Sequence, residues 1–118
     1  MLDIKKYAAI DIGSNAVRLL ISNVIKQDNN PPVFKKSSLV RVPIRLGSDV
    51  FVTGYISEEN KERMLDTMTA FKLIMKSHRV AAYKACATSA MREAKNGYDF
   101  AEEIKETAGI SVDIIDGE

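Results

Sequence analysis

A short apolar segment that meets a polar turn constrains the fold of this chain more than any other feature. The residues from Tyr7 to Ile10 are apolar, and the sequence Asp-Ile-Gly-Ser-Asn follows at 11–15. The next segment, 16–25, is rich in β-branched residues and too short between turn signals for a helix. The pattern predicts two strands joined by a tight polar turn, which is a hairpin.

The segment after this hairpin predicts a third strand followed by a loop. Proline and asparagine in QDNNPP, at 27–32, indicate a second turn. A strand is expected over 33–46, and Pro43 places it near a sheet edge or a bulge. Residues 47–54 have the composition of a loop. The expected core positions of this strand are Leu39, Val42 and Ile44.

The second half of the chain predicts helices that alternate with strands. A helix is expected from Ser57 to about His78, because a hydroxyl and two acids begin it and large apolar residues recur at helical spacing. Those residues are Met64, Met68, Phe71 and Met75. Strands are expected over 80–87 and 112–115, with a second helix between Asp99, in a capping box with Glu102, and Gly109. The element order is β-β-β-α-β-α-β, an α/β domain with a mixed five-stranded sheet.

Composition excludes several classes of function. The chain has 118 residues and 17 basic against 16 acidic side chains, so its net charge does not indicate nucleic acid or a membrane surface as a partner. One cysteine, Cys86, allows neither an internal disulfide nor a thiolate metal cluster, which fits a cytoplasmic setting. The start of the sequence does not resemble a signal peptide, and no apolar segment is long enough to span a bilayer. We therefore expect one soluble domain, or part of a larger one.

The first turn carries residues suited to an anion and its metal ion. Gly13 allows close approach of the backbone, and Ser14 and Asn15 add side-chain donors. Asp11 can hold Mg²⁺ through its waters, while Arg18, in the second strand, offers a bidentate fork to the same anion. The alternative is an ordinary hairpin turn with a solvated aspartate.

A second group of candidate residues lies where the fourth predicted strand runs into a helix. Thr88 and Ser89 supply hydroxyl groups beside the free amides of a helix start. Arg92 lies about one turn into that helix and can reach a phosphate; the alternative is a surface ion pair with Glu93 or Asp99. This segment alone is weak evidence, because hydroxyl residues cap most helices.

Taken together, the segments DIGSNAVR at 11–18 and ATSAMREA at 87–94 resemble the exopolyphosphatase / guanosine pentaphosphate phosphohydrolase family. The resemblance implies a ribonuclease-H-like domain of the actin-like ATPase superfamily, one of two lobes that face each other across a cleft. It implies that Asp11 is a metal-side carboxylate. The implied phosphate contacts are Gly13, Ser14, Asn15 and Arg18 in the first motif and Thr88, Ser89 and Arg92 in the second.

The family's general-base glutamate belongs to a segment that this chain reaches only at its start. Aligned on Gly117, Glu118 lies just before the usual catalytic position, so the base is expected just after Glu118. The resemblance therefore implies a Mg²⁺-dependent amino-terminal lobe, 1–118, that binds polyphosphate or guanosine pentaphosphate and hydrolyses little without its carboxy-terminal lobe. A homodimer of such a half is compatible with the apolar surface it exposes. Two alternatives stay open: a guanosine tetra- or pentaphosphate-binding regulator without rapid turnover, and the first lobe of an actin-like sugar kinase.

Overall fold

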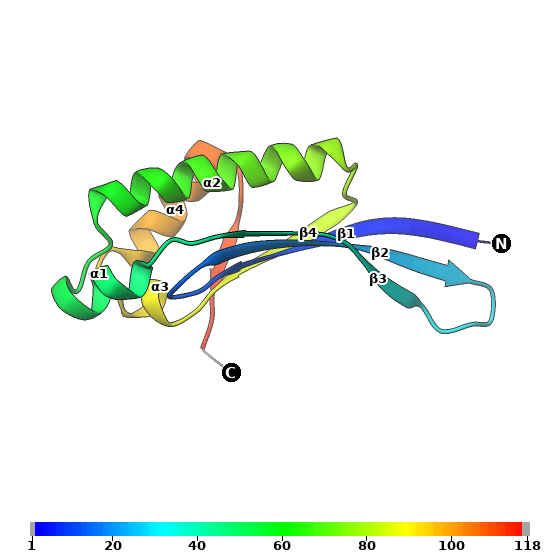
Figure 1. Cartoon of the computed structure of the whole chain (residues 1–118), viewed down its shortest axis with the longest axis horizontal. Helices are drawn as coiled ribbons and strands as arrows, with labels where there is room; N and C mark the ends of the chain where they lie inside the picture. Colours follow the sequence, from blue (N-terminus) through cyan, green and yellow to red (C-terminus); the bar gives the residue numbers. More distant parts are fainter. Residues whose placement is uncertain (1, 117–118) are drawn as a thin grey trace.

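A mixed five-stranded sheet forms the body of the molecule, as the computed structural model shows for residues 2–116 (Figure 1). The strands lie in the spatial order β3-β2-β1-β4-β5. Their bounds are β1 (Leu2–Ile12), β2 (Val17–Gln27), β3 (Val33–Val42), β4 (Ala82–Ala87) and β5 (Val112–Ile114). The five predicted strands are present, and β3 is an edge strand, as Pro43 indicated. The predicted end of this strand at 46 is wrong, since β3 ends at Val42.

The first three strands form an antiparallel meander, and the last two add to it in parallel. β1 pairs with β2 through eleven residue pairs, from Leu2 opposite Gln27 to Ile12 opposite Val17. β1 also pairs with β4, and β4 with β5, in parallel. Because parallel strands require a crossover connection, the helices between β3 and β4 and between β4 and β5 follow from this topology.

The segment predicted as a loop over 47–54 is instead a helix, α1 (Leu46–Thr53). Gly54 ends it in the left-handed conformation, with φ of 86°, which glycine adopts without steric cost. Burial of Leu46 and Val50 stabilises a segment whose β-branched and aromatic residues disfavour a helix. Tertiary packing therefore overrides local propensity here.

The long helix α2 (Glu58–Ser77) agrees with the prediction. The Ser57 side chain accepts a hydrogen bond from the Asn60 amide and caps the helix, and the predicted stripe from Met64 to Met75 is buried. Asp49 of α1 reinforces the cap, since its Oδ2 accepts bonds from the Ser57 amide, the Ser57 hydroxyl and the Asn60 side chain at 2.7–3.0 Å. Partial burial raises the pKa of Asp49, but these bonds outweigh it and leave the pKa below its ordinary value.

Two helices lie between β4 and β5, α3 (Ser89–Glu93) and α4 (Gly97–Ala108). The predicted capping box of Asp99 and Glu102 is wrong, because α4 begins after Asn96 and Asp99 lies in its first turn. The Asn96 side chain does not cap the helix but exchanges two hydrogen bonds with the Ile56 backbone, at 2.9 and 3.1 Å. Gly109 ends α4 as predicted, with φ of 71°.

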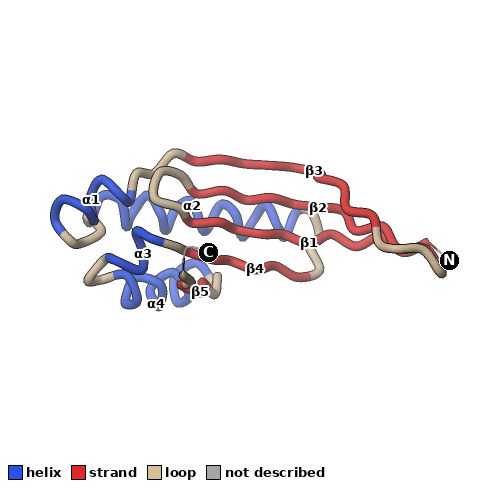
Figure 2. Tube along the Cα trace, turned by 90° about the horizontal axis from the view of Figure 1, so that it is seen from below, coloured by secondary structure: helices blue, strands red, loops and turns tan. Residues whose placement is uncertain are grey.

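The helices cover one face of the sheet and leave the other face open, as Figures 1 and 2 show. Side chains alternate along the strands. The residues that face the helices are buried, among them Ile10, Ile12, Val17, Leu19 and Ile21. We call the opposite surface the open face; Leu20 and Leu39 lie across from each other on it.

Leu39 was predicted to lie in the core, but it is 51% exposed on the open face. Its neighbour Val40 packs against the core instead, as do the predicted positions Val42, partly, and Ile44, fully buried. The pairing of β2 with β3 shifts register between Ile21 and Ser22, which leaves Ser37 without a partner residue in β2. The bulge lies before Leu39, and from Leu39 to Val42 the strand is regular, so alternation places these two residues on opposite faces and both could not lie in the core. Within residues 2–116, no helix is long and apolar enough to cross a membrane.

Candidate functional site

The two sequence motifs meet at one end of the sheet. β1 and β4 are parallel and end together at Ile12 and Ala87, and the Thr88 amide donates to the Ile12 carbonyl at 3.3 Å. Figure 2 shows α1, α3 and the last described residues gathered at this same end. Ligands of open α/β sheets bind outside the carboxyl ends of parallel strands. We call this end the carboxyl edge.

The turn between β1 and β2 is held by its own backbone and by α1. The Gly13 amide donates to the Ala16 carbonyl at 3.0 Å, so this amide closes the turn rather than facing a ligand. A Cβ atom at Gly13 would lie 3.3 Å from that carbonyl oxygen, which gives the glycine a steric reason independent of any ligand. The Ser14 carbonyl accepts from the Gly47 amide at 2.9 Å. Ser14 and Asn15 thus remain as the donors that the turn presents.

Asp11 and Arg18 face each other across the hairpin. Arg18 Nη2 lies 3.1 Å from Asp11 Oδ2. The Asp11 side chain is 51% exposed and the Arg18 side chain 53%. An exposed ion pair of this kind contributes little to stability, about 0–1 kcal/mol, so an incoming cation or anion can displace it at small cost. The pair therefore holds a carboxylate and a guanidinium ready beside the turn.

The pair belongs to a row of residues that crosses all five strands on the open face. Strand register aligns its members in the order Arg41, Arg18, Asp11, Cys86 and Asp113. Each is flanked along its strand by residues that face the helices, which places the five on the opposite surface. The row is basic at β3 and β2 and acidic at β1 and β5. Its last member, Asp113, forms an ion pair with Lys84 of β4, at 3.4 Å.

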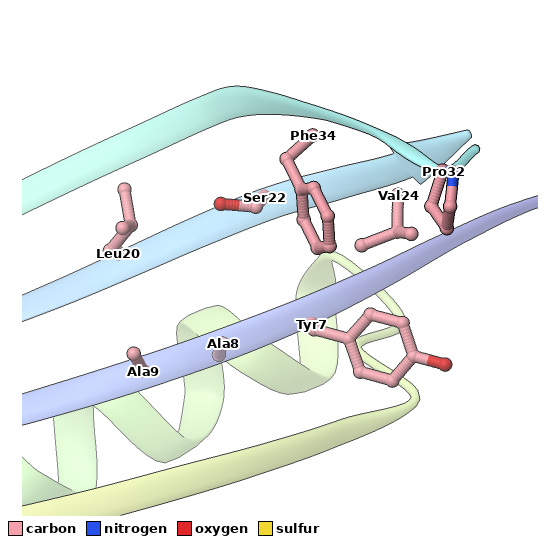
Figure 3. Close-up of a pocket in the computed structure, with 8 residues that line it drawn as sticks. All are labelled: Tyr7, Ala8, Ala9, Leu20, Ser22, Val24, Pro32 and Phe34. Atoms are coloured by element: carbon pink, nitrogen blue, oxygen red, sulfur yellow. The ribbon is translucent and has the colours of Figure 1, made fainter. Parts of the chain in front are cut away.

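Two shallow hollows lie along the open face next to this row. One, of about 290 Å³, has the Asp11–Arg18 pair at its rim and is otherwise lined by Ala9, Leu20 and Leu39. The other, of about 380 Å³, shares Ala9 and Leu20 with it and continues toward the rings of Tyr7 and Phe34 (Figure 3). The open face is thus mostly apolar around these two hollows, and the Asp11–Arg18 ion pair lies where the face reaches the carboxyl edge.

The second motif presents hydroxyl groups on a very short helix. Thr88 precedes α3 and makes no side-chain cap bond, and Ser89 is the first residue of a helix of five residues. Helix α3 is too short for a developed dipole, and the Thr88 amide already donates to the Ile12 carbonyl, so this wall offers the two hydroxyls and the Ser89 amide. Both side chains are partly buried at the carboxyl edge.

Arg92 is less free than the sequence suggested. Its Nη1 donates to the Ile115 carbonyl at 2.8 Å, and its Nε lies 3.6 Å from Glu93 Oε1, so the predicted alternative of an ion pair with Glu93 is present. The Ile115 amide in turn donates to the Ala87 carbonyl at 2.9 Å. Arg92 therefore binds the chain on its way to Gly117 and Glu118. The expected general-base position beyond Glu118 lies outside the described residues.

The acidic residues fit a metal ion that is held mainly by water and substrate. Residues 2–116 contain no group of three histidine, cysteine, aspartate or glutamate side chains close enough to hold a metal. Mg²⁺ usually binds through one or two carboxylates, several waters and substrate phosphates, and a single exposed Asp11 suits that pattern. The same arrangement would not suit a structural zinc ion, which requires four protein ligands.

Two further residues of the site were not predicted. Arg41 is in register with Arg18, and this pairing depends on the bulge in β3 and on the loop length between β2 and β3. Gly47 supports the Ser14 turn from a helix that the sequence did not predict. The only sequence signal for that helix was the spacing of Leu46 and Val50, two apolar residues four positions apart.

Comparison with known proteins shows which family this chain resembles in sequence and in structure. The model of the Ppx/GppA phosphatase family matches residues 24–118. A solved structure of the Aquifex aeolicus member of the Ppx/GppA protein family superposes with a TM-score of 0.88 at 32% identity, and the alignment covers 98% of this chain and 36% of that one.

Two curated relatives are similar over nearly the whole chain. Exopolyphosphatase 1 of Mycobacterium tuberculosis is 26% identical over 96% of this chain and 32% of its own length. The guanosine-5'-triphosphate,3'-diphosphate pyrophosphatase of Photobacterium profundum is 27% identical over 95% of this chain and 22% of its own length. The chain therefore spans about a third or less of these two relatives. The strand order and the superposition on the Aquifex aeolicus structure agree with the predicted α/β domain with a mixed five-stranded sheet.

Proposed function

The chain belongs to the Ppx/GppA phosphatase family, and on that premise we propose that it is the phosphate-binding lobe of a phosphohydrolase. The substrate class is a linear phosphoanhydride chain, polyphosphate or guanosine pentaphosphate, from which water removes the terminal phosphate. The observation that carries the proposal is the hydrogen bond between the Thr88 amide and the Ile12 carbonyl, which brings the two motifs to one edge. Membership in this family sets aside the sugar kinase alternative.

Each wall of the proposed site contributes a different kind of contact. The Ser14 and Asn15 groups of the turn, with the Thr88 and Ser89 hydroxyls opposite, donate hydrogen bonds to terminal phosphate oxygens. Arg18 supplies a guanidinium that leaves Asp11 when a phosphate arrives, since a charge-assisted fork to phosphate is at least as strong as an exposed ion pair. Fixed donors of this kind are useful in hydrolysis because they stabilise negative charge without reorganising.

Mg²⁺ is the metal that we assign to Asp11. When bound, it would offset charge on the phosphate oxygens and orient the terminal group. Asp11 would hold it through one carboxylate beside the turn, with water and phosphate as the other ligands. When Arg18 leaves Asp11 for the phosphate, Mg²⁺ would replace the guanidinium as the positive charge beside the Asp11 carboxylate.

The proposed chemistry needs a second lobe. Hydrolysis requires a base that activates water and groups that stabilise the leaving phosphate, and the expected base position lies beyond Glu118. We therefore propose that residues 2–116 bind the substrate, and that a facing carboxy-terminal lobe completes the cleft. By itself the chain would bind phosphate chains weakly and release little phosphate.

The test is the affinity of the 118-residue chain for tripolyphosphate, measured by calorimetry with and without Mg²⁺. The unaltered chain should bind more tightly with Mg²⁺, and Asp11→Asn should remove that dependence. Thr88→Val should weaken binding about five- to tenfold, because it removes one hydroxyl donor to a charged group. Asp66 is exposed on α2, a helix on the side of the sheet opposite the open face, so Asp66→Asn makes the same charge change away from the site and should behave as the unaltered chain.

Binding that is independent of Mg²⁺, of Asp11 and of Thr88 would show that the phosphate site is elsewhere. Phosphate release by this chain alone, at a rate comparable to that of a full-length relative, would show that no second lobe is needed. Binding that depends on Asp11 without any release supports the lobe assignment.

A further inference from the structure

We infer that Arg41 forms, with Arg18, a second phosphate subsite that holds the substrate chain beyond its terminal groups and favours long chains over short ones. This inference rests on the proposed function and adds to it a residue outside both sequence motifs. It concerns the basic end of the row on the open face.

The first observation is the cross-strand pairing of two arginines. Arg18 of β2 lies directly opposite Arg41 of β3. Residues at such positions have Cβ atoms about 5 Å apart, and like charges placed there destabilise a sheet. The arrangement therefore has no benefit for the fold, and a bound polyanion would remove the repulsion.

The second observation concerns the charge around Arg41. Arg18 is paired with Asp11 at 3.1 Å, whereas Arg41 has no ion-pair partner within residues 2–116. The chain as a whole carries a formal net charge of only +1, so this local excess does not reflect a generally basic surface. Local excess of this kind concentrates anions.

The position of Arg41 fits the path of a chain that starts at the turn. Its neighbour Val42 pairs with Val17, the first residue after the turn, so Arg41 lies one residue pair from the proposed terminal-phosphate site. Strands in a sheet lie about 4.8 Å apart. A phosphate chain whose end is held at Ser14 and Asn15 can therefore cross from Arg18 to Arg41 with successive phosphates. Arginine suits this role because its planar fork can bind two phosphate oxygens at once.

The experiment compares long-chain polyphosphate with pyrophosphate, both with Mg²⁺, on the unaltered chain and on Arg41→Ala. Arg41→Ala should weaken binding of the long chain about tenfold, which is the loss of one charge-assisted contact, and weaken pyrophosphate binding less than about twofold. The salt dependence of long-chain binding should also become shallower. Because the like-charge repulsion disappears, the melting temperature should stay the same or rise.

Lys36→Ala is the matched control. Lys36 is exposed on the same strand and, opposite Ser22, on the same face. On β2, Ser22 is four residues from Arg18, about 13 Å along the strand. This variant removes the same charge and should change binding of both ligands by less than about twofold.

Equal loss of affinity for both ligands in Arg41→Ala, or an equal effect of Lys36→Ala, would overturn the subsite while leaving the proposed function intact. Failure of the unaltered chain to bind either ligand would overturn both. If Arg41→Ala lowers the melting temperature instead, Arg41→Lys decides. Arg41→Lys keeps the charge but lacks the fork, so it should lose part of the long-chain affinity at unchanged stability. Full retention of that affinity by Arg41→Lys would contradict the subsite.

Discussion

Replacing Gly47 with alanine would press a methyl group against the turn that we propose binds phosphate. A Cβ atom built at this position lies 3.1 Å from Ser14 Cβ, 3.3 Å from the Ser14 carbonyl oxygen and 3.2 Å from the ring of Phe51. The Phe51 ring is 66% exposed and can rotate away. The Ser14 atoms belong to a turn bonded to α1 through the Gly47 amide, so the turn or the helix must move by a few tenths of an ångström.

The expected loss of stability is small because two effects oppose each other. Overpacking costs about 1–3 kcal/mol, and alanine recovers about 1 kcal/mol over glycine inside a helix. The free energy of unfolding should therefore fall by about 0–2 kcal/mol. Binding should suffer more than stability, because displaced donors no longer match the phosphate oxygens. We expect tripolyphosphate affinity to fall about tenfold.

Urea denaturation and calorimetry on Gly47→Ala separate these two effects. Ser48→Ala is the control, since Ser48 is the next residue of α1, is exposed, and should tolerate alanine in both assays. A Gly47→Ala chain that binds tripolyphosphate as tightly as the unaltered chain would refute the reasoning that α1 sets the position of the turn. A loss above about 4 kcal/mol would show instead that neither the turn nor the helix can move.

Two further substitutions test the packing that supports the site. Gly97→Ala places a Cβ atom onto the Met91 carbonyl oxygen, a backbone overlap that side-chain rotation cannot relieve. We therefore expect the free energy of unfolding, measured by urea denaturation, to fall by at least about 3 kcal/mol. Unchanged stability would contradict this packing of α3 against α4. Asp49→Ala removes the acceptor for Ser57 and Asn60 and should cost about 1–2 kcal/mol at pH 7. Because hydrogen bonds lower the pKa of Asp49 in the folded chain, its contribution is complete above the unfolded pKa and is lost as pH falls through the lower folded pKa. The difference in stability between the two chains should therefore shrink on acidification below about pH 4; a difference that stays constant on acidification would contradict it.

Features that depend on local sequence were predictable. The DIGSN turn between two β-branched segments indicated the hairpin of β1 and β2, and the Ser57 cap with the methionine stripe indicated α2. In both cases the local preference and the tertiary packing agree. That the two motifs meet followed from the family resemblance, and the structure gives the reason, since β1 and β4 are parallel neighbours whose carboxyl ends share an edge.

Features that depend on tertiary contacts were not predictable. Helix α1 forms from residues with poor helix propensity because Leu46 and Val50 are buried and the Gly47 amide has a partner in the turn. Asn96 could not be distinguished from an ordinary loop residue, since its partner Ile56 is far away in the sequence. The pairing of Arg18 with Asp11, and of Arg41 with Arg18, follows from loop lengths and a bulge that determine strand register.

The central claim is that the two motifs form one phosphate site at the carboxyl edge. The most direct test is an NMR titration. Amide nitrogen–proton correlation spectra of the chain are recorded while tripolyphosphate and Mg²⁺ are added. The largest shifts should fall on Ser14, Asn15, Arg18, Thr88 and Ser89, and all five should saturate at one concentration. Shifts confined to the exposed lysines at 5–6 or 35–36, or separate saturation of the two motifs, would contradict the claim.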